Sequence, residues 1–292
     1  MMDAMSLRDL EYVVAVERER SITGAAASIP MAQPALSQAI ARIERRLGVV
    51  LFRRTSRTVV PTEAGALLVE RARRILGDVA RAIDDTRATG GHRQVRIQVT
   101  EPSLTVPRRM FAAIRHALPD AAVHQMTVPR SQVAGKLVGG ELTASVGPRE
   151  RGPGLVAEEL CREGVRAVFG PDHPLAHHDA VTVADVAAFP IVSIDPGMSD
   201  WNATVARHLA RFGAVPRWTE SSAFGAVAAA DLVHGSDAVF LALDSIARGL
   251  IGPSVHLPID PEWSITWFVN WRAQPEPMPC TREAVDAMRG SA

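Results

Sequence analysis

One stretch near the N-terminus constrains this chain more than any other. Residues 21–62 read SITGAAASIPMAQPALSQAIARIERRLGVVLFRRTSRTVVPT. Ser21 predicts the N-cap of a short helix, whose alanines are small enough for another helix to approach closely. Pro30 ends that helix because proline has no amide hydrogen to donate. A longer helix is predicted to start near Gln33 and to close at Gly48. The stretch therefore predicts two helices joined by a tight turn.

The longer helix has two different faces. Its apolar stripe repeats at helical spacing and consists of Leu36, Ile40, Ile43 and Leu47. The opposite face carries short, amide and cationic side chains, namely Gln33, Ser37, Gln38, Ala41 and Arg42. Glutamine can pair with adenine and arginine with guanine or phosphate, so this face suits a DNA major groove. Taken alone, the helix fits an ordinary amphipathic helix with a solvated face equally well.

The residues that follow favour DNA binding. An apolar run, Val49–Phe52, precedes an arginine-rich segment that is predicted to form a β-hairpin able to contact phosphates or the minor groove. Between Arg42 and Arg57 the chain has six Arg and one Glu, whereas the whole chain has no net charge. Charge runs are commonly only solvated surface. Here the run directly follows a helix-turn-helix, which favours a basic face for DNA.

The order and spacing of these residues resemble the LysR-type transcriptional regulators. The match covers about sixty residues without a gap and includes Leu10, Ala25, Ala26, the run Gln33–Ser37, Ile40, Glu44, Leu47, Gly48, Leu51, Phe52, Arg54, Thr55 and the run Thr62–Gly65. Two departures are Ala32, where the family usually has Ser, and Pro30 in the turn. We expect residues 1–62 to form a winged helix-turn-helix domain that contacts double-stranded DNA through Gln33, Pro34, Ser37, Gln38, Arg42, Arg53, Arg54 and Arg57.

Residues 63–90 are predicted to form a long linker helix, with Thr62 as its cap. Apolar or small residues recur in it at heptad spacing: Leu68, Ala72, Ile75, Val79, Ala82 and Thr86. Such a seam predicts pairing with a second copy, and the resemblance implies a homodimer or homotetramer formed through this helix. Packing of the seam on its own chain is the alternative. Gly90 and Gly91 then predict a hinge.

The pattern changes to α/β from Arg93 onward, where predicted strands alternate with helices and favour a mostly parallel sheet. We expect residues 91–292 to form an effector-binding domain of two lobes, lobe I at about 93–161 and 265–292 and lobe II at about 162–264. Two strands crossing between the lobes imply a cleft. The resemblance implies a fold like a type 2 periplasmic binding protein, with RNA polymerase as a further partner that the family allows.

Ligands of open α/β sheets bind beyond the carboxyl ends of the strands. This rule selects an effector site of Thr100, Glu101, Ser103, Thr127, Ser193 and Ser199. Each of these residues fits a helix cap or a turn equally well. Glu101 would repel a carboxylate ligand unless it has a partner of its own.

Other features narrow the remaining classes. Cys161 and Cys280 are far apart in the sequence, so neither a disulfide nor a metal framework is expected. The acidic N-terminus does not resemble a signal peptide and no apolar run is long enough to span a membrane, so we expect a cytoplasmic protein. His173, His177 and His178 could bind a metal, but the segment is loop-like and has no cluster of other ligands. No metal, cofactor or membrane partner is predicted.

An enzyme, or a ligand-binding protein that uses the α/β cleft, is the alternative function. It is weakened because the sequence has no G-x-S-x-G, P-loop or G-x-G-x-x-G motif. A structural DNA-binding protein is a third class, and it would leave the two-lobed half unexplained.

Overall fold

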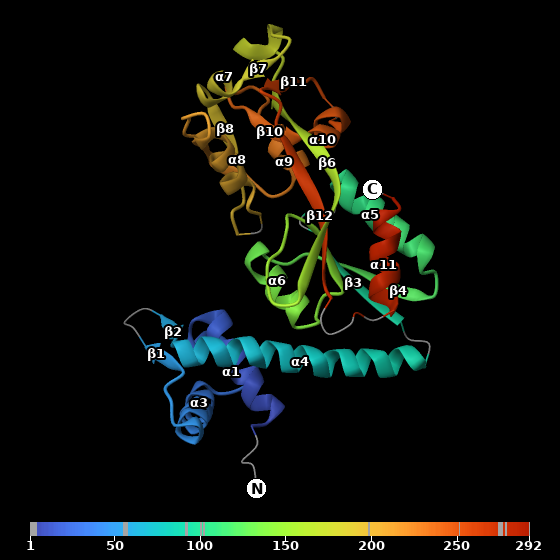
Figure 1. The fold of residues 1–292 in the computed structure, drawn as a ribbon. Helices are drawn as coiled ribbons and strands as arrows, with labels where there is room; N and C mark the ends of the chain where they lie inside the picture. The colour runs from blue at the N-terminus through green and yellow to red at the C-terminus, as the bar shows by residue number, and fades with distance from the viewer. Residues whose placement is uncertain are drawn as a thin grey trace. The chain divides into compact units, whose positions relative to one another are not determined.

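The computed structural model divides the chain into two compact units. The first contains Met1–Gly90 together with 138–141, and the second contains the remainder. The structure describes residues 5–54, 58–90, 93–99, 101, 103–197, 199–250, 252–273, 277 and 279–291. Figure 1 shows the mainly helical first unit and the mixed α/β second unit. No helix within the described residues has the length and apolar character needed to cross a membrane.

The first unit is built on three short helices with locally encoded ends. Ser6 and Asp9 form a capping box at the first helix, and the Ser21 side chain accepts from the Gly24 amide at the second. Gly48 ends the third helix in the left-handed conformation, as predicted. The bounds are α1 (Leu7–Glu19), α2 (Ile22–Ser28) and α3 (Gln33–Leu47). Their shared core includes Val13, Val16, Ala25, Leu36, Ile40 and Ile43, each at most 4% exposed.

The wing is a short hairpin of β1 (Phe52–Arg54) and β2 (Val59–Pro61), paired antiparallel. The Glu44 carboxylate fixes its first strand by accepting from the amides of Leu51 at 2.8 Å and Phe52 at 3.2 Å. Thr62 caps the next helix through the Gly65 amide. Gly65 must be glycine, because a Cβ there would lie 2.0 Å from the Leu51 carbonyl oxygen. The hairpin and the helix start are thus held together by residues that the family pattern singled out.

The linker helix α4 (Glu63–Thr89) agrees with the prediction for this segment. The prediction that the heptad positions face a second copy is wrong at Ala72, because this side chain is fully buried within the single chain. Leu68 also packs partly against the core of the first unit. The large apolar side chains that remain exposed on α4 are Leu67, Ile75 and Ile83. The first two positions of the predicted seam, Leu68 and Ala72, therefore pack on their own chain, whereas Ile75 remains exposed.

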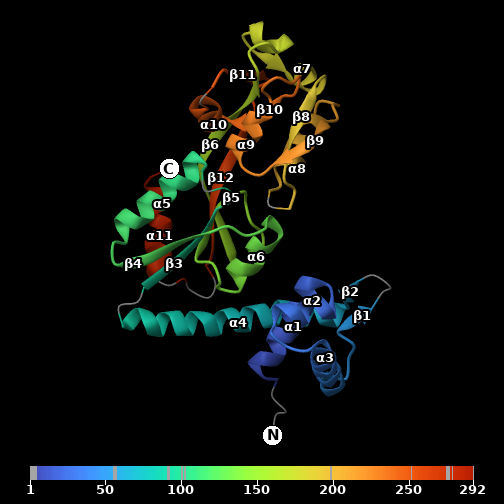
Figure 2. The same cartoon turned by 180° about the vertical axis from the view of Figure 1, so that it is seen from behind.

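The second unit consists of two lobes joined by two long strands, β6 (Leu155–Phe169) and β12 (Ser264–Arg272). These strands pair antiparallel from Leu155↔Arg272 to Gly164↔Ser264. Beyond Gly164, β6 pairs instead with strands of lobe II. Figures 1 and 2 show both strands running from one lobe into the other. The change of pairing partners falls near Gly164 on β6 and Ser264 on β12.

Lobe I is a sheet with helices packed on it. Strands β4, β3 and β5 are parallel, and β12 joins β5 antiparallel. Its core includes Val95, Ile97, Met110, Ile114 and Val146, each fully buried. The bounds are β3 (Arg93–Val99), α5 (Thr105–Ala117), β4 (Ala121–Met126), α6 (Arg130–Val138), β5 (Ala144–Gly147) and α11 (Pro279–Arg289).

Lobe II adds β10 and β11, both antiparallel to β6, and a parallel pair of β8 and β9. The bounds are η1 (Pro174–His177), β7 (Val181–Thr182), α7 (Val183–Ala187), β8 (Pro190–Ile194), α8 (Trp201–Ala210), β9 (Arg217–Ala223), α9 (Ala226–Asp231), β10 (Phe240–Leu243), α10 (Asp244–Gly249) and β11 (Val255–Asp260). The expectation of a mostly parallel sheet is wrong. The long strands β6 and β12 pair antiparallel with each other, and β12 also pairs antiparallel with β5.

Candidate DNA-binding face and effector cavity

The predicted reading face of α3 is turned to solvent. Gln33, Pro34, Gln38 and Arg42 are exposed, while Ser37 is half-buried. Ala32 precedes the helix and provides no side-chain cap, as expected from its departure from the family. The helix therefore presents amide groups near its start and cations toward its end, which is the arrangement predicted for a major groove.

Asp9 on α1 braces the cationic end of α3. Its carboxylate lies 3.4 Å from Arg46 Nη2 and 3.7 Å from Arg42 Nη2. Burial opposes ionisation of Asp9, but hydrogen bonds from Ser6 and the charges of Arg46 and Arg42 outweigh it, so the pKa of Asp9 lies below its ordinary value. Arg42 nevertheless remains 59% exposed at its side chain. The brace orients this guanidinium without withdrawing it from the surface.

The wing supplies one more described cation, Arg53, which is exposed on β1. Arg54 belongs to the same strand in its backbone, but its side chain lies outside the described residues, as does all of Arg57. The DNA-contact roles of all eight residues stay predictions.

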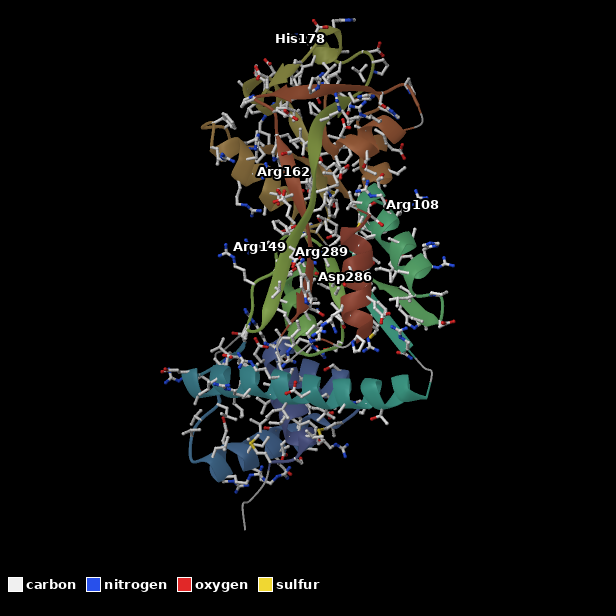
Figure 3. The ribbon with its side chains drawn as sticks, turned by 45° about the vertical axis from the view of Figure 1, so that its right-hand side comes forward. Arg108, Arg149, Arg162, His178, Asp286 and Arg289 are labelled. Carbon is white, nitrogen blue, oxygen red and sulfur yellow. The ribbon has the colours of Figure 1, made fainter. Side chains whose placement is uncertain are left out.

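The second unit has a cavity of about 380 Å³ between its lobes, within the range typical of small-molecule sites. Glu101, Leu104 and Arg149 line it from lobe I, and Trp201, Arg207 and Ala226 are among its lobe II residues. The hinge segment contributes Trp263 and Trp267. Figure 3 shows Arg149 projecting from the ribbon on one side of this unit.

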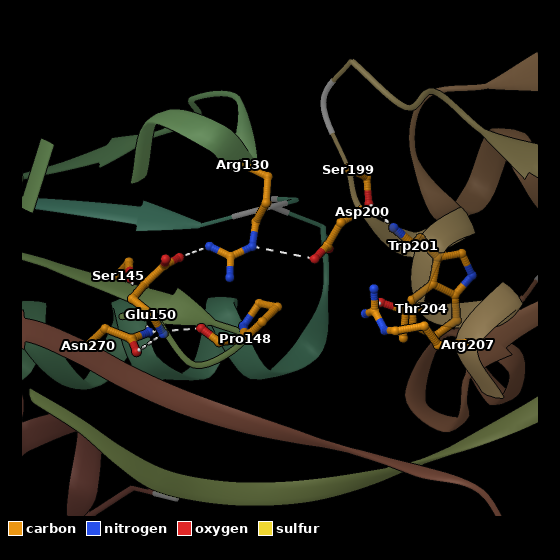
Figure 4. Close-up of polar contacts among 10 residues, drawn as sticks. All are labelled: Arg130, Ser145, Pro148, Glu150, Ser199, Asp200, Trp201, Thr204, Arg207 and Asn270. Atoms are coloured by element: carbon orange, nitrogen blue, oxygen red, sulfur yellow. Dashed lines mark hydrogen bonds and ion pairs between the residues drawn. The ribbon is translucent and has the colours of Figure 1, made fainter. Parts of the chain in front are cut away.

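Two polar contacts connect the lobes beside the cavity. Glu101 accepts from the Ala226 amide at 2.9 and 3.1 Å through its two oxygens, and it also accepts from the Ser103 hydroxyl. Arg130 of lobe I pairs with Glu150 and lies 3.5 Å from Asp200 at the start of α8. Figure 4 shows Arg130 between these two carboxylates. Glu101 thus has the partner that the sequence left open, a backbone amide of the other lobe.

Asn270 positions the loop that carries Glu150. It is fully buried on β12. Its Oδ1 accepts from the Glu150 amide at 2.8 Å, and its Nδ2 donates to Ser145 Oγ at 3.2 Å and to the Pro148 carbonyl at 3.1 Å. Three hydrogen bonds from one buried amide fix this loop rigidly.

The predicted effector residues are brought together only in part. Glu101 and Ser199 line the cavity. The Ser103 hydroxyl donates to the carboxylate of the lining residue Glu101, and Ser193 Oγ accepts from Asn202 Nδ2 at 3.0 Å. Thr127 is exposed and is not among the lining residues, and Thr100 lies outside the described residues. Ser199 accepts from the Trp201 amide, while the N-cap position of α8 is Asp200.

Sequence reasoning missed Trp201, Trp263, Trp267 and Arg207 as cavity residues. The strand-end rule finds loops after parallel strands, whereas these residues come from a helix and from the antiparallel hinge. A signal was available, because the chain has only five Trp and three of them line this one cavity.

The remaining chemical groups have structural roles. His173 is buried, stacks on Phe169 at 4.7 Å, accepts from the Leu175 amide at Nδ1 and contacts the Asp237 carbonyl at Nε2. Burial raises the pKa of both Cys161 and Cys280, which disfavours the reactive thiolate. No group of three His, Cys, Asp or Glu side chains within the described residues could hold a metal ion.

The chain combines a winged helix-turn-helix unit with a two-lobed α/β unit that has a cavity between its lobes. This combination defines the class of protein to which the chain is compared. Residues 7–66 match the family model of the bacterial regulatory helix-turn-helix protein, lysR family, and residues 88–292 match the LysR substrate binding domain. The chain belongs to the LysR family.

Curated relatives are regulators of transcription by name. The chain is 29% identical over 198 residues to the Escherichia coli (strain K12) "DNA-binding transcriptional dual regulator OxyR", covering 66% of this chain and 65% of that one. It is 39% identical over 143 residues to the Klebsiella aerogenes "HTH-type transcriptional regulator BudR", covering 47% of this chain and 99% of that one. The matches thus span just under two thirds of the OxyR-type relatives.

Solved structures share the fold along the whole chain. Full-length CbnR complexed with its target DNA has 22% sequence identity and a TM-score of 0.58, covering 98% of this chain and 99% of that one. Full-length BenM has 23% identity and a TM-score of 0.62, covering 98% and 96%.

Proposed function

We propose that this protein is a sequence-specific DNA-binding regulator of transcription, controlled by a small-molecule effector in the cavity between its two lobes. The exposed face of α3 carries the proposal, since amide and guanidinium groups stand there on a helix whose other face is core. The CbnR structure with target DNA supports it, because a chain of the same fold binds DNA. We place the protein in the cytoplasm, and RNA polymerase is a further proposed partner.

A mobility-shift assay on the DNA flanking the protein's own coding region tests this function. A shifted band that weakens steeply as salt rises is expected, since phosphate contacts release counterions. The absence of any shift at low salt would reject the proposal.

Residue roles can be separated with two variants. Gln38→Ala should change the preference between matched and mismatched sites by about 1–3 kcal/mol, whereas Arg53→Ala should weaken all sites uniformly. Arg8→Ala is the matched control, because Arg8 is an exposed cation on α1 outside the proposed face. If Gln38→Ala lowered the affinity for both kinds of site equally, the reading role of α3 would be refuted.

We also propose that α4 forms a homodimer, with tetramers built from dimers. Leu67, Ile75 and Ile83 leave apolar surface exposed on this helix, and covering it with a second copy is favourable. Ile75→Glu is expected to shift the sedimentation coefficient toward monomer and to weaken binding to a two-half-site operator. Glu70→Gln is a control on the same helix. A dimer that survives Ile75→Glu and Ile83→Glu together would rule out this interface.

Peroxide sensing is not proposed, although relatives are named "Hydrogen peroxide-inducible genes activator". A peroxide-reactive cysteine needs a low pKa and exposure. Cys280 is buried, Cys161 is half-buried, and burial raises the pKa of both thiols.

A further inference from the structure

Aromatic side chains are concentrated around the cavity. The whole chain has five Trp, eight Phe and one Tyr. Six of these fourteen line the cavity: Trp201, Phe224, Phe240, Trp263, Trp267 and Phe268. Flat, apolar walls of this kind complement a flat, apolar ligand body.

The tryptophan walls are held in place before any ligand arrives. Trp201 Nε1 donates to the Leu241 carbonyl at 3.0 Å, and Trp267 Nε1 donates to Glu163 at 2.8 Å. Trp263 stacks with Trp201 at 5.7 Å and with His208 at 4.1 Å, with nearly parallel ring planes. Because the indole N–H groups of Trp201 and Trp267 are already used, these two rings offer a ligand apolar surface only. Polar recognition must come from other residues.

Four charged residues line the cavity, and the two acidic ones already have partners. Glu101 binds the Ala226 amide, and Asp200 lies 3.5 Å from Arg130. The two arginines differ. Arg207 donates to Thr204 Oγ1 at 2.9 Å, and Arg149 lies over the Phe268 ring at 5.8 Å. Within the described residues, neither guanidinium pairs with a carboxylate. The charge left available to a ligand is therefore positive.

Glu101 and Arg207 give the wall of the cavity two charged groups of opposite sign. Glu101 already occupies the amide of Ala226, so a ligand carboxylate placed there would lose that donor and meet a like charge. Arg207 extends from α8 beside Thr204 and Trp201, opposite Arg130 and Glu150 of lobe I (Figure 4). An anionic group is therefore disfavoured beside Glu101 and favoured beside Arg207.

We propose that the cavity binds a flat aromatic compound carrying a single carboxylate, with its ring among the tryptophans and its carboxylate at Arg207, and that Glu101 fixes this orientation. This inference rests on the function proposed for the cavity and names the chemical class of its effector.

The test titrates the full-length protein by calorimetry with three probes that share one ring and differ in charge: indole-3-acetate, indole-3-acetamide and tryptamine. Indole-3-acetate is expected to bind at least tenfold more tightly than indole-3-acetamide, because only the anion can form an ion pair with Arg207. Tryptamine is expected to bind most weakly, because its positive charge repels that of Arg207. Arg207→Gln should remove the preference for the anion while leaving the affinity for the amide within twofold. Arg162→Gln, an exposed arginine of β6 outside the cavity, is the matched control and should keep the preference.

Glu101→Gln retains an oxygen that can accept from Ala226 but removes the negative charge, so the affinity for indole-3-acetate should rise. Equal affinities for the three probes, tightest binding of the amide or the amine, or no binding of any probe would overturn the proposed class. A preference for the anion that survives Arg207→Gln would overturn the assigned orientation. DNA binding without any probe is measured in parallel by mobility shift, so that a failed ligand class is distinguished from a failed DNA-binding function. Melting temperatures of the variants confirm that each is folded.

Discussion

The two units place their proposed functional groups in opposite environments. On α3 four of the five residues proposed to read DNA are exposed and Ser37 is half-buried, while a separate set, including Leu36 and Ile43, forms the core. In the second unit two of the cavity-lining tryptophans are themselves part of the core, since Trp263 is 7% and Trp267 is 3% exposed. Substitutions of the recognition residues should therefore leave the stability of the first unit unchanged, whereas substitutions in the cavity wall should change both ligand binding and the stability of the second unit.

The largest expected effect tests that coupling. Trp263→Ala removes a buried ring that stacks with Trp201 and His208, and truncation of a buried aromatic costs about 3–5 kcal/mol. Denaturant unfolding of the second unit should show the loss, with the affinity for aromatic probes falling as well. Trp263→Phe should recover most of the stability. Ligand binding lost with unchanged stability would contradict the coupling of wall and core.

A backbone clash gives the next largest effect, in the first unit. A Cβ at Gly65 would lie 2.0 Å from the Leu51 carbonyl oxygen, so the start of α4 must move away from the hairpin. Gly65→Ala should destabilise this unit by about 1–3 kcal/mol. Gly24→Ala is the control, because its Cβ meets atoms no closer than 3.4 Å and alanine is the better helix former. Equal stabilities of the two variants in thermal unfolding would show that the close approach is not real.

The brace at Asp9 predicts a pH dependence of the first unit. Its folded pKa lies below the unfolded value, so its contribution to the free energy of unfolding is present above about pH 4 and is lost as pH falls through the folded pKa. Asp9→Asn should cost about 1–2 kcal/mol at pH 7 and reduce the loss on acidification. Unfolding curves at pH 7 and pH 3 measure both. An unchanged slope with pH would mean that other carboxyl groups dominate.

Local signals explain how much of this molecule could be predicted from its sequence. Ser21, Gly48 and Thr62 determine helix ends through contacts within a few residues, and all three act as predicted. Structure that depends on contacts between distant parts of the chain was harder to predict. No strand was predicted at β6, although it is the longest strand, because its first half mixes charged with apolar residues and its pairing partner β12 lies about a hundred residues away.

The same distinction applies to the cavity. Glu101 and Ser199 were found because they follow strands, whereas Trp263 and Trp267 line the cavity through the antiparallel hinge, which no local pattern indicates. The charge of Glu101 was visible in the sequence, but its partner at Ala226 is 125 residues away. At Ala72 the local pattern was misleading. The residue has the heptad spacing of a dimer interface, but its side chain is buried within its own chain.

The smallest expected effect concerns the start of α3, where the separation of recognition from stability can be examined directly. Ala32 gives this helix no side-chain cap, and Pro34 has no amide hydrogen, so a serine hydroxyl at position 32 would accept from the Ala35 amide. Ala32→Ser should stabilise the first unit by about 1 kcal/mol, a gain limited because that amide already donates to the Ala32 carbonyl at 3.0 Å. Ala41→Ser on the exposed middle of the same helix is the control and should cost a few tenths of a kcal/mol. If Ala32→Ser raises the melting temperature and leaves the preference between operators unchanged, cap and reading face are independent. A changed preference without a change in stability would instead place residue 32 within the DNA contact.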